Sequence, residues 1–239
     1  MSLLSLFSVS LTLNNHTILN DVSFDVAQGE VIGLIGPNGS GKTTLFNLLS
    51  GFLKPTSGSI LFKDENITNV IPSKRARLGF GRVFQHFGIF RDMTLEENVR
   101  VALEALPRDK RKELGNMDEL VDATLDMALL KPYAKKKAGS LSGGQMRLLE
   151  IARTLTSGKE LFLLDEPTAG VSPKMTHQVA DMISKLKQQG KTVLIIEHDL
   201  PFIAQICDRV IVLDVGKVVL SGNPTEVRDS EELKEIYFG

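Results

Sequence analysis

A glycine-rich segment near the start of the chain has the residue types that bind a row of phosphates. It reads Gly36-Pro37-Asn38-Gly39-Ser40-Gly41-Lys42-Thr43 and fits the pattern G-x-x-x-x-G-K-[ST]. Phosphates need several backbone N–H groups aimed at one point, and glycine removes the side chains that would block them. We expect Lys42 to reach the β and γ phosphates, Thr43 to bind Mg²⁺ through its hydroxyl, and Thr44 to support the phosphates. The guanine-specific sequence Asn-Lys-x-Asp is absent, which favours ATP as the ligand.

Two acidic residues and a histidine stand at the ends of two apolar runs farther along the chain. Residues 160–164 lead into Asp165 and Glu166, and residues 192–197 lead into His198. An acid at a strand end is typical of the aspartate that holds Mg²⁺ beside a phosphate loop, so Asp165 is assigned to the metal. Glu166 is expected to orient or deprotonate the attacking water, and His198 to contact the γ-phosphate.

Gln85 is a further candidate for the same chemistry. It follows the segment 81–84, and its amide is suited to contact Mg²⁺ or the attacking water. A glutamine in a loop is usually only solvated, so the residue type alone leaves both interpretations open.

A second glycine motif begins at Leu141. It reads Leu141-Ser142-Gly143-Gly144-Gln145 and is followed by a helical pattern over 146–155. Ser142 is a good helix N-cap, and glycine amides at a helix start form an anion site. Five residues alone do not separate such a site from an ordinary capped helix.

The elements that must position these residues follow from hydrophobic periodicity. Apolar runs and period-two alternation predict strands, and Thr94 with Glu97 forms a capping box that predicts a helix start. The buried run 31–35, a glycine loop and a helix over 43–49 indicate an α/β fold with a parallel sheet. No strand pattern appears between about residues 90 and 158, which indicates a mostly helical insertion. The strands are expected at 9–13, 22–26, 31–35, 59–63, 160–165, 191–197, 209–214 and 218–220.

Composition excludes several classes of protein. The chain has 239 residues, with 28 Lys plus Arg against 29 Asp plus Glu, so it is not a broadly basic nucleic-acid binder. One cysteine, Cys207, excludes a disulfide framework and fits a reducing cytosol. No apolar stretch approaches the length of a spanning helix. Residues 1–7 lack a basic start and are broken by serines, so we expect a buried first strand rather than a signal peptide.

The ordered set of motifs resembles the ATP-binding cassette (ABC) ATPase family over nearly the full chain. The resemblance implies a RecA-like P-loop core with an antiparallel β-subdomain over 1–85 and 157–239, and a helical subdomain over 86–156. It also implies that Gln85 is the Q-loop glutamine, that Glu166 is the general base, and that His198 holds the γ-phosphate and water in line. ATP and Mg²⁺ are the implied ligands.

The same resemblance implies a head-to-tail dimer with a second ATPase subunit, identical or paralogous. In this arrangement Ser142, Gly143, Gly144 and Gln145 of one subunit bind the ATP held by Lys42 of the other. Each ATP then bridges two surfaces while its γ-phosphate is present, so binding closes the dimer and hydrolysis opens it.

Two positions depart from the pattern of the family. Leu13 stands where an aromatic residue usually stacks on adenine, which predicts weaker or less base-selective binding. Ser172 stands where many members carry an aspartate after the metal-binding strand. Ser172 has no charge, so communication between the two ATP sites is in doubt while hydrolysis is not.

Three segments point to a class of transporter. Residues 84–98, 196–199 and 236–239 are similar to those of branched-chain amino acid importer ATPases, and lipopolysaccharide-export ATPases are close relatives. We expect polytopic membrane subunits, an extracytoplasmic substrate-binding protein, no nucleic acid, and a peripheral position at the cytoplasmic face of the inner membrane. The alternatives are lipopolysaccharide export and a soluble ABC ATPase without transport. The apolar residues after Gln85 are Phe87, Ile89 and Phe90. Two interpretations stay open for them: they receive a membrane subunit, or they pack within the helical subdomain.

Overall fold

A central, mostly parallel sheet carries the segments that hold the candidate residues. The computed structural model describes residues 2–84, 88–106 and 108–238. Six strands follow the order β10-β9-β3-β8-β7-β6, and β10 alone runs antiparallel to its neighbour. They are β3 (Val31–Ile35), β6 (Phe80–Val83), β7 (Leu161–Asp165), β8 (Thr192–Ile196), β9 (Arg209–Asp214) and β10 (Lys217–Gly222).

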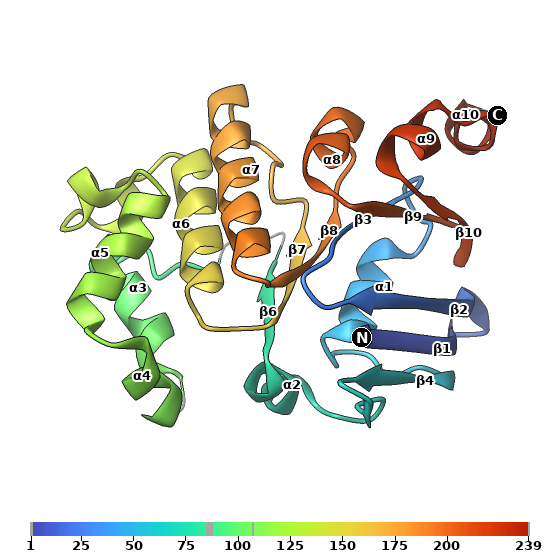
Figure 1. Cartoon of the computed structure of the whole chain (residues 1–239), viewed down its shortest axis with the longest axis horizontal. Coiled ribbons are helices and arrows are strands. Elements are labelled where there is room, and N and C mark those ends of the chain that lie inside the picture. Colours follow the sequence, from blue (N-terminus) through green and yellow to red (C-terminus); the bar gives the residue numbers. More distant parts are fainter. Residues whose placement is uncertain (1, 85–87, 107, 239) are drawn as a thin grey trace.

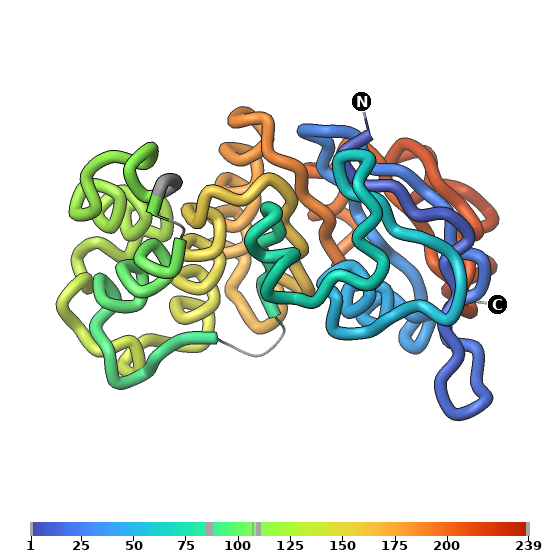
Figure 2. Tube along the Cα trace, turned by 90° about the horizontal axis from the view of Figure 1, so that it is seen from below, coloured from blue at the N-terminus to red at the C-terminus, as the bar shows by residue number. Residues whose placement is uncertain are grey.

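A second, antiparallel sheet of four strands lies beside the first, in the order β2-β1-β4-β5. Its strands are β1 (Ser2–Leu13), β2 (His16–Ala27), β4 (Ser57–Phe62) and β5 (Glu65–Asn66). The expected buried strand over 1–7 is the first half of β1, although Phe7 is exposed. The tip of the β1–β2 hairpin projects from the body of the molecule (Figure 2).

Helices cover both faces of the central sheet (Figure 1). Alternate residues of β3 enter different clusters, because Ile32 and Leu34 pack with α1 and the smaller sheet, whereas Val31 and Ile35 pack with the other helices. Burial on both faces explains why these strands are continuous apolar runs. The helices are α1 (Lys42–Leu49), α2 (Pro72–Leu78), α3 (Leu95–Glu104), α4 (Arg108–Leu114), α5 (Met117–Met127), α6 (Gly143–Leu155), α7 (Pro173–Gln188), α8 (Leu200–Ile206), α9 (Pro224–Asp229) and α10 (Glu231–Phe238).

The segment between β6 and β7 is helical, as its sequence predicts. Between residues 90 and 158 the described residues form no named strand and only an isolated bridge between Thr94 and Lys137. Both predicted N-caps are confirmed: Thr94 and Ser142 each form a capping box, with Glu97 and Gln145. Figure 1 shows α3, α4 and α5 grouped at the end of the molecule away from the smaller sheet, with α6 next to them.

The apolar residues after Gln85 do not behave as one group. Ile89 packs against the main core, whereas Phe90 is 47% exposed. Phe87 and Gln85 lie outside the described residues. No helix formed by the described residues combines the length and apolarity that crossing a membrane requires.

Candidate functional site

The predicted phosphate loop joins β3 to α1, and backbone geometry explains its glycines. Gly36, Gly39 and Gly41 have φ values of 146°, 82° and 105°, which side-chain-bearing residues rarely adopt. A Cβ on Gly36 would also lie 1.9 Å from the carbonyl oxygen of Leu213 on β9. Gly41 is the N-cap of α1, and no side chain caps that helix. The first amides of α1 are therefore left for a ligand, and the helix dipole favours an anion there.

Lys42 is the charged group of this loop. Its side chain is buried, and Nζ donates hydrogen bonds to the carbonyl oxygens of Gly36 and Pro37 at 2.7 and 2.8 Å. Burial lowers the pKa of Lys42, while the carboxylates of Glu166 and Asp165 act in the opposite direction. The hydroxyl of Ser40 is buried and finds no hydrogen-bond partner within the described part of the chain. Both groups have capacity for an anionic ligand.

Strand order brings the acidic residues and the histidine to this loop. β3 pairs with β8 and β8 pairs with β7, so the carboxyl ends of all three meet at one edge of the sheet. There the Nε2 atom of His198 lies 3.1 Å from Oε1 of Glu166. The backbone N–H of Glu166 donates to the carbonyl oxygen of Ile196 at 2.9 Å. Glu166 has a φ of 47°, an uncommon backbone conformation for a residue with a side chain and one that concentrates at functional sites.

A pocket of about 190 Å³ forms at this edge. It is lined by Ile18, Asn38, Gly39, Gly41, Lys42, Thr43, Thr44, Glu166 and His198. The structure thus gathers most of the sequence-predicted ATP-binding residues with two of the three catalytic candidates. Leu13 is not among the lining residues; it is 43% exposed at the hairpin tip, where it pairs with His16. The third catalytic candidate, Gln85, lies outside the described residues.

The residues assigned to the metal have the right donor chemistry. Thr43 offers a hydroxyl at the pocket and Asp165 a carboxylate at the end of β7, and hard oxygen donors of this kind suit Mg²⁺. Asp165 is 3% exposed, and its Oδ2 lies 3.6 Å from Nη2 of Arg82. Burial raises the pKa of Asp165, and the charge of Arg82 opposes that rise.

The second glycine motif stands apart from this pocket. Ser142 is the N-cap of α6 and is exposed, and none of Ser142–Gln145 lines the pocket. The Ser142 hydroxyl accepts from the N–H of Gln145 at 3.3 Å, and the Gln145 side chain accepts from the N–H of Ser142 at 3.0 Å. A Cβ on Gly144 would lie 2.5 Å from the sulfur of Met175, so the motif sits close to α7.

Arg147 ties this motif to the catalytic strand. Its side chain is 2% exposed and donates to the carbonyl oxygens of Asp165 and Glu166 at 2.6 and 2.7 Å. It also donates to the carbonyl oxygen of Phe84 at 2.5 Å and to Glu150 at 3.1 Å. One buried guanidinium therefore joins α6, the end of β7 and the residue before Gln85.

Sequence reasoning missed four residues of this region. Ile18 lines the pocket, Arg82 faces Asp165, Arg147 holds the catalytic strand, and the hydroxyl of Tyr237 accepts a hydrogen bond from the N–H of Gly36 at 3.0 Å. An arginine in the mostly apolar sequence of α6 was a usable signal for Arg147, because a buried arginine needs several acceptors. Ile18 and Tyr237 carry no comparable local signal.

Known proteins resemble this chain over its whole length. A family described as ABC transporter matches residues 19–169. The branched-chain amino acid transport ATP-binding protein LivG of Escherichia coli K12 is 35% identical over 99% of this chain and 98% of its own. The lipopolysaccharide export ATP-binding protein LptB of Acidithiobacillus ferridurans is 36% identical over 99% of this chain and 97% of its own. The ADP conformation of MJ1267, an ATP-binding cassette of an ABC transporter, superposes with a TM-score of 0.87 at 33% identity, covering 100% of this chain and 99% of that one. With the phosphate loop and the catalytic strand ends in place, these matches show that the chain belongs to the ABC transporter family as an ATP-binding, ATP-hydrolysing subunit.

Proposed function

We propose that two such subunits close head to tail around two ATP molecules and thereby drive a membrane transporter. One observation carries the proposal: the pocket gathers Lys42, Glu166 and His198, whereas the exposed Ser142 lies outside it. A phosphate-binding motif that does not reach the pocket of its own chain is available to the pocket of another. The segment Ser142–Gln145 then binds the terminal phosphate in trans, through its hydroxyl and its helix-start amides.

Each residue of the pocket has a distinct task in ATP hydrolysis. Lys42, now hydrogen-bonded to loop carbonyls, moves to the β and γ phosphates when ATP binds. Glu166 is the general base for the attacking water. His198 holds the γ-phosphate, and its ring contact with Glu166 keeps the two side chains together. Gln85 is proposed to contact Mg²⁺ or the attacking water. The residues proposed to bind ATP in cis are Leu13, Gly36, Pro37, Asn38, Gly39, Ser40, Gly41, Lys42, Thr43 and Thr44.

Thr43, Asp165 and Gln85 are proposed to hold Mg²⁺. When bound, the ion would neutralise negative charge on the phosphate oxygens. Arg82 positions the Asp165 carboxylate from the opposite side, at 3.6 Å. We propose a division of labour to match: residues 1–85 and 157–239 form the nucleotide-binding core, and residues 86–156 form the helical unit that carries Ser142.

The dimer is tested with Glu166→Gln, which keeps the side-chain shape but removes the base. The variant is expected to bind Mg-ATP, to hydrolyse it about a hundredfold or more slowly, and to accumulate as a dimer, because the bridging γ-phosphate stays in place. Light scattering with ATP and with ADP measures the assembly state. The same variant carrying Ser142→Ala is the control and should dimerise less. A Glu166→Gln chain that binds ATP and stays monomeric at high protein concentration contradicts the dimer.

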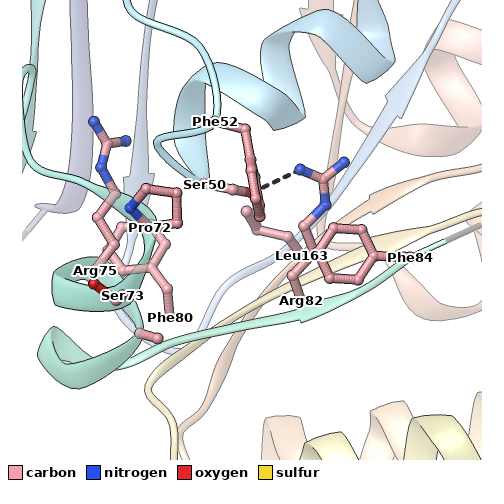
Figure 3. Close-up of a pocket in the computed structure, with 10 residues that line it drawn as sticks. Ser50, Phe52, Pro72, Ser73, Arg75, Phe80, Arg82, Phe84 and Leu163 are labelled. Atoms are coloured by element: carbon pink, nitrogen blue, oxygen red, sulfur yellow. Dashed lines mark hydrogen bonds between the residues drawn. The ribbon is translucent and has the colours of Figure 1, made fainter. Parts of the chain in front are cut away.

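A second pocket, of about 310 Å³, is proposed to receive a membrane subunit (Figure 3). The rings of Phe52 and Phe84 meet edge to face at 5.8 Å, are 56% and 40% exposed, and flank the guanidinium of Arg82. Arg82 donates to Ser50 at 3.0 Å and faces Asp165. An apolar helix of a membrane subunit seated on these rings would thus press on a residue that reaches the catalytic strand.

A cross-link tests this docking. Cys207 is the only cysteine, and burial raises its pKa, which disfavours the reactive thiolate. Phe52→Cys in the assembled transporter is expected to cross-link to a membrane subunit, and Lys191→Cys, which lies between α7 and β8 and does not line this pocket, is not. Cross-linking of both, or of Lys191→Cys alone, contradicts docking at this pocket.

The transported substrate is proposed to be a branched-chain amino acid, taken up with an extracytoplasmic binding protein. The supporting feature is Glu197-His198-Asp199 together with residues 84–98, which are similar to the importer ATPases. Lipopolysaccharide export is the second candidate, because LivG and LptB are almost equally similar to this chain. In either case the subunit works at the cytoplasmic face of the inner membrane.

Identification of the membrane proteins that co-purify with the chain separates these functions. Two permease subunits, with ATPase activity stimulated by a binding protein loaded with leucine, isoleucine or valine, support import. Lipid-export membrane subunits support the second candidate. Purification without any polytopic membrane protein contradicts both and supports a soluble ABC ATPase.

A further inference from the structure

Tyr237 reaches the first residue of the phosphate loop from a distant part of the chain. It lies on α10, and its hydroxyl oxygen accepts a hydrogen bond from the backbone N–H of Gly36 at 3.0 Å, across 201 positions of sequence. Figure 1 shows α10 above β9 and β10, next to α9. The contact therefore joins the last helix of the chain to the start of the nucleotide site.

Gly36, the first residue of the loop, has a backbone conformation that depends on glycine. Its φ of 146° lies in the region that glycine adopts freely, and the carbonyl of Leu213 leaves no room for a side chain. Tyr237 holds the N–H of Gly36, and Nζ of Lys42 donates to its carbonyl at 2.7 Å. A rotation about the Gly36 backbone would disturb both contacts, so the tyrosine and the phosphate-binding lysine act on the same residue.

The packing of α10 fixes the position of Tyr237 relative to Gly36. Leu233 on the same helix is buried, and both Ile236 and Tyr237 pack against the main core cluster. Burial raises the pKa of Tyr237, so its hydroxyl is neutral at physiological pH and adds no negative charge beside a triphosphate. The acceptor is therefore fixed in position and compatible with an anionic ligand.

We propose that Tyr237 is a positioning residue for nucleotide binding, which acts through Gly36 and does not touch the nucleotide. The inference rests on the proposed role of the phosphate loop. With the hydroxyl present, the loop is held in one conformation before ATP arrives. Without it the N–H of Gly36 loses its partner, the loop samples other conformations, and the apparent affinity falls by the fraction of time the loop is competent.

The test is Tyr237→Phe, which removes the hydroxyl and keeps the ring. Calorimetry on the full chain is expected to give about three- to tenfold weaker binding of both ATP and ADP, the range of one net hydrogen bond. KM for ATP should rise by the same factor, while kcat stays within about twofold. Hydrogen exchange at the Gly36 amide should become faster. The control is Tyr133→Phe, which changes the only other tyrosine, on the helical segment before α6, and should leave these values unchanged.

A purely structural tyrosine gives a different result. It would lower Tm in Tyr237→Phe and Tyr237→Ala and leave the Kd for nucleotide and the Gly36 exchange rate as in the wild type; that result overturns the proposal. Loss of affinity for ATP with none for ADP also overturns it, because the loop serves both. The role of the loop is checked separately by Lys42→Ala: if that variant binds ATP normally, the loop assignment fails, whatever Tyr237→Phe does.

Discussion

Two helices of this chain begin at a glycine-rich phosphate-binding sequence, and their N-termini are completed in different ways. At α1 no side chain caps the helix, and distant contacts shape the loop in front of it, from Leu213 and Tyr237 to Gly36. At α6 the cap is local, because Ser142 and Gln145 satisfy each other three residues apart. The first loop keeps its amides open and is fixed to the core sheet. The second is capped by its own sequence.

Arg147 links these regions by hydrogen bonds, in addition to the apolar packing of α6 within the main core cluster. Its guanidinium comes from α6, yet its acceptors are the carbonyls of Asp165 and Glu166 at the catalytic edge. A displacement of α6 must therefore either carry the end of β7 with it or break these hydrogen bonds. The difference between a loop shaped by distant contacts and a motif capped by its own neighbours generates the following predictions.

The largest effect is expected from Arg147→Met. The substitution removes the ion-pair partner of the buried Glu150 carboxylate and the donor to four backbone carbonyls, so we expect about 3–5 kcal/mol lower free energy of unfolding. Arg153→Met is the control on the same helix; it loses one hydrogen bond to the Gly88 carbonyl and should cost about 1 kcal/mol. Urea denaturation measures both. Equal losses would show that Arg147 is not the link between the two regions.

Lys42→Ala tests the first phosphate loop alone. Removal of a charged donor to phosphate is expected to weaken ATP binding by the isolated chain about ten- to a hundredfold. Lys63→Ala, which removes only an exposed ion pair with Glu160, is the matched control and should bind normally. Equilibrium titration with ATP gives both values. If Lys42→Ala binds ATP within twofold of the wild type, Lys42 does not bind the phosphates.

Leu13→Tyr asks whether the hairpin tip reaches the nucleotide. Leu13 is 43% exposed and does not line the pocket, although Ile18 of the neighbouring strand does. A tyrosine ring that stacks on adenine should tighten ATP binding by about 1–2 kcal/mol and increase the preference for ATP over other nucleotides. Val219→Tyr, at another exposed position on β10, is the control. Equal affinities of Leu13→Tyr and the wild type would place the base elsewhere.

Ser142→Ala and Thr94→Ala separate the stabilising effect of a helix cap from the proposed function of the motif Ser142–Gln145. Both residues close a capping box, so each substitution should lower the free energy of unfolding by about 1 kcal/mol. Only Ser142 belongs to the proposed trans site, so only Ser142→Ala should reduce ATP-dependent dimerisation. Thermal unfolding and light scattering provide the two readouts. A similar loss of dimerisation in Thr94→Ala would mean that helix stability, not the motif, controls assembly.

Local sequence was sufficient where a signal and its partner lie close together. The capping box of Thr94 with Glu97 and the N-cap at Ser142 were predicted, since a capping residue acts on the backbone two or three positions later. The apolar runs of β3, β7 and β8 were predicted because strands buried on both faces need no polar alternation. The strand β6 was not predicted, because Gly81 and Arg82 interrupt the apolar pattern, although the strand pairs with β7.

The gathering of residues at the site required the sheet order. Glu166 and His198 were separate candidates in the sequence, and they meet because β7 and β8 are neighbours. The sequence assigns no role to Arg82. The pairing of β6 with β7 brings the Arg82 side chain to Asp165. Leu13, predicted to stand at the adenine, does not line the pocket, whereas Ile18 does, and the apolar side chain of Ile18 carries no chemical signature.

The sequence by itself determined the family of the chain, through an ordered set of motifs typical of ABC ATPases, and it predicted a phosphate loop, a metal-binding acid, a base, a histidine and a second phosphate-binding motif. It could do so because such motifs depend on residues a few positions apart. Only the tertiary structure decided which groups brace them, since most acceptors of Arg147 and the donor to Tyr237 are backbone atoms. Every residue has such atoms, so residue type carries no information about them, and only the packing of strands and helices selects the ones that meet.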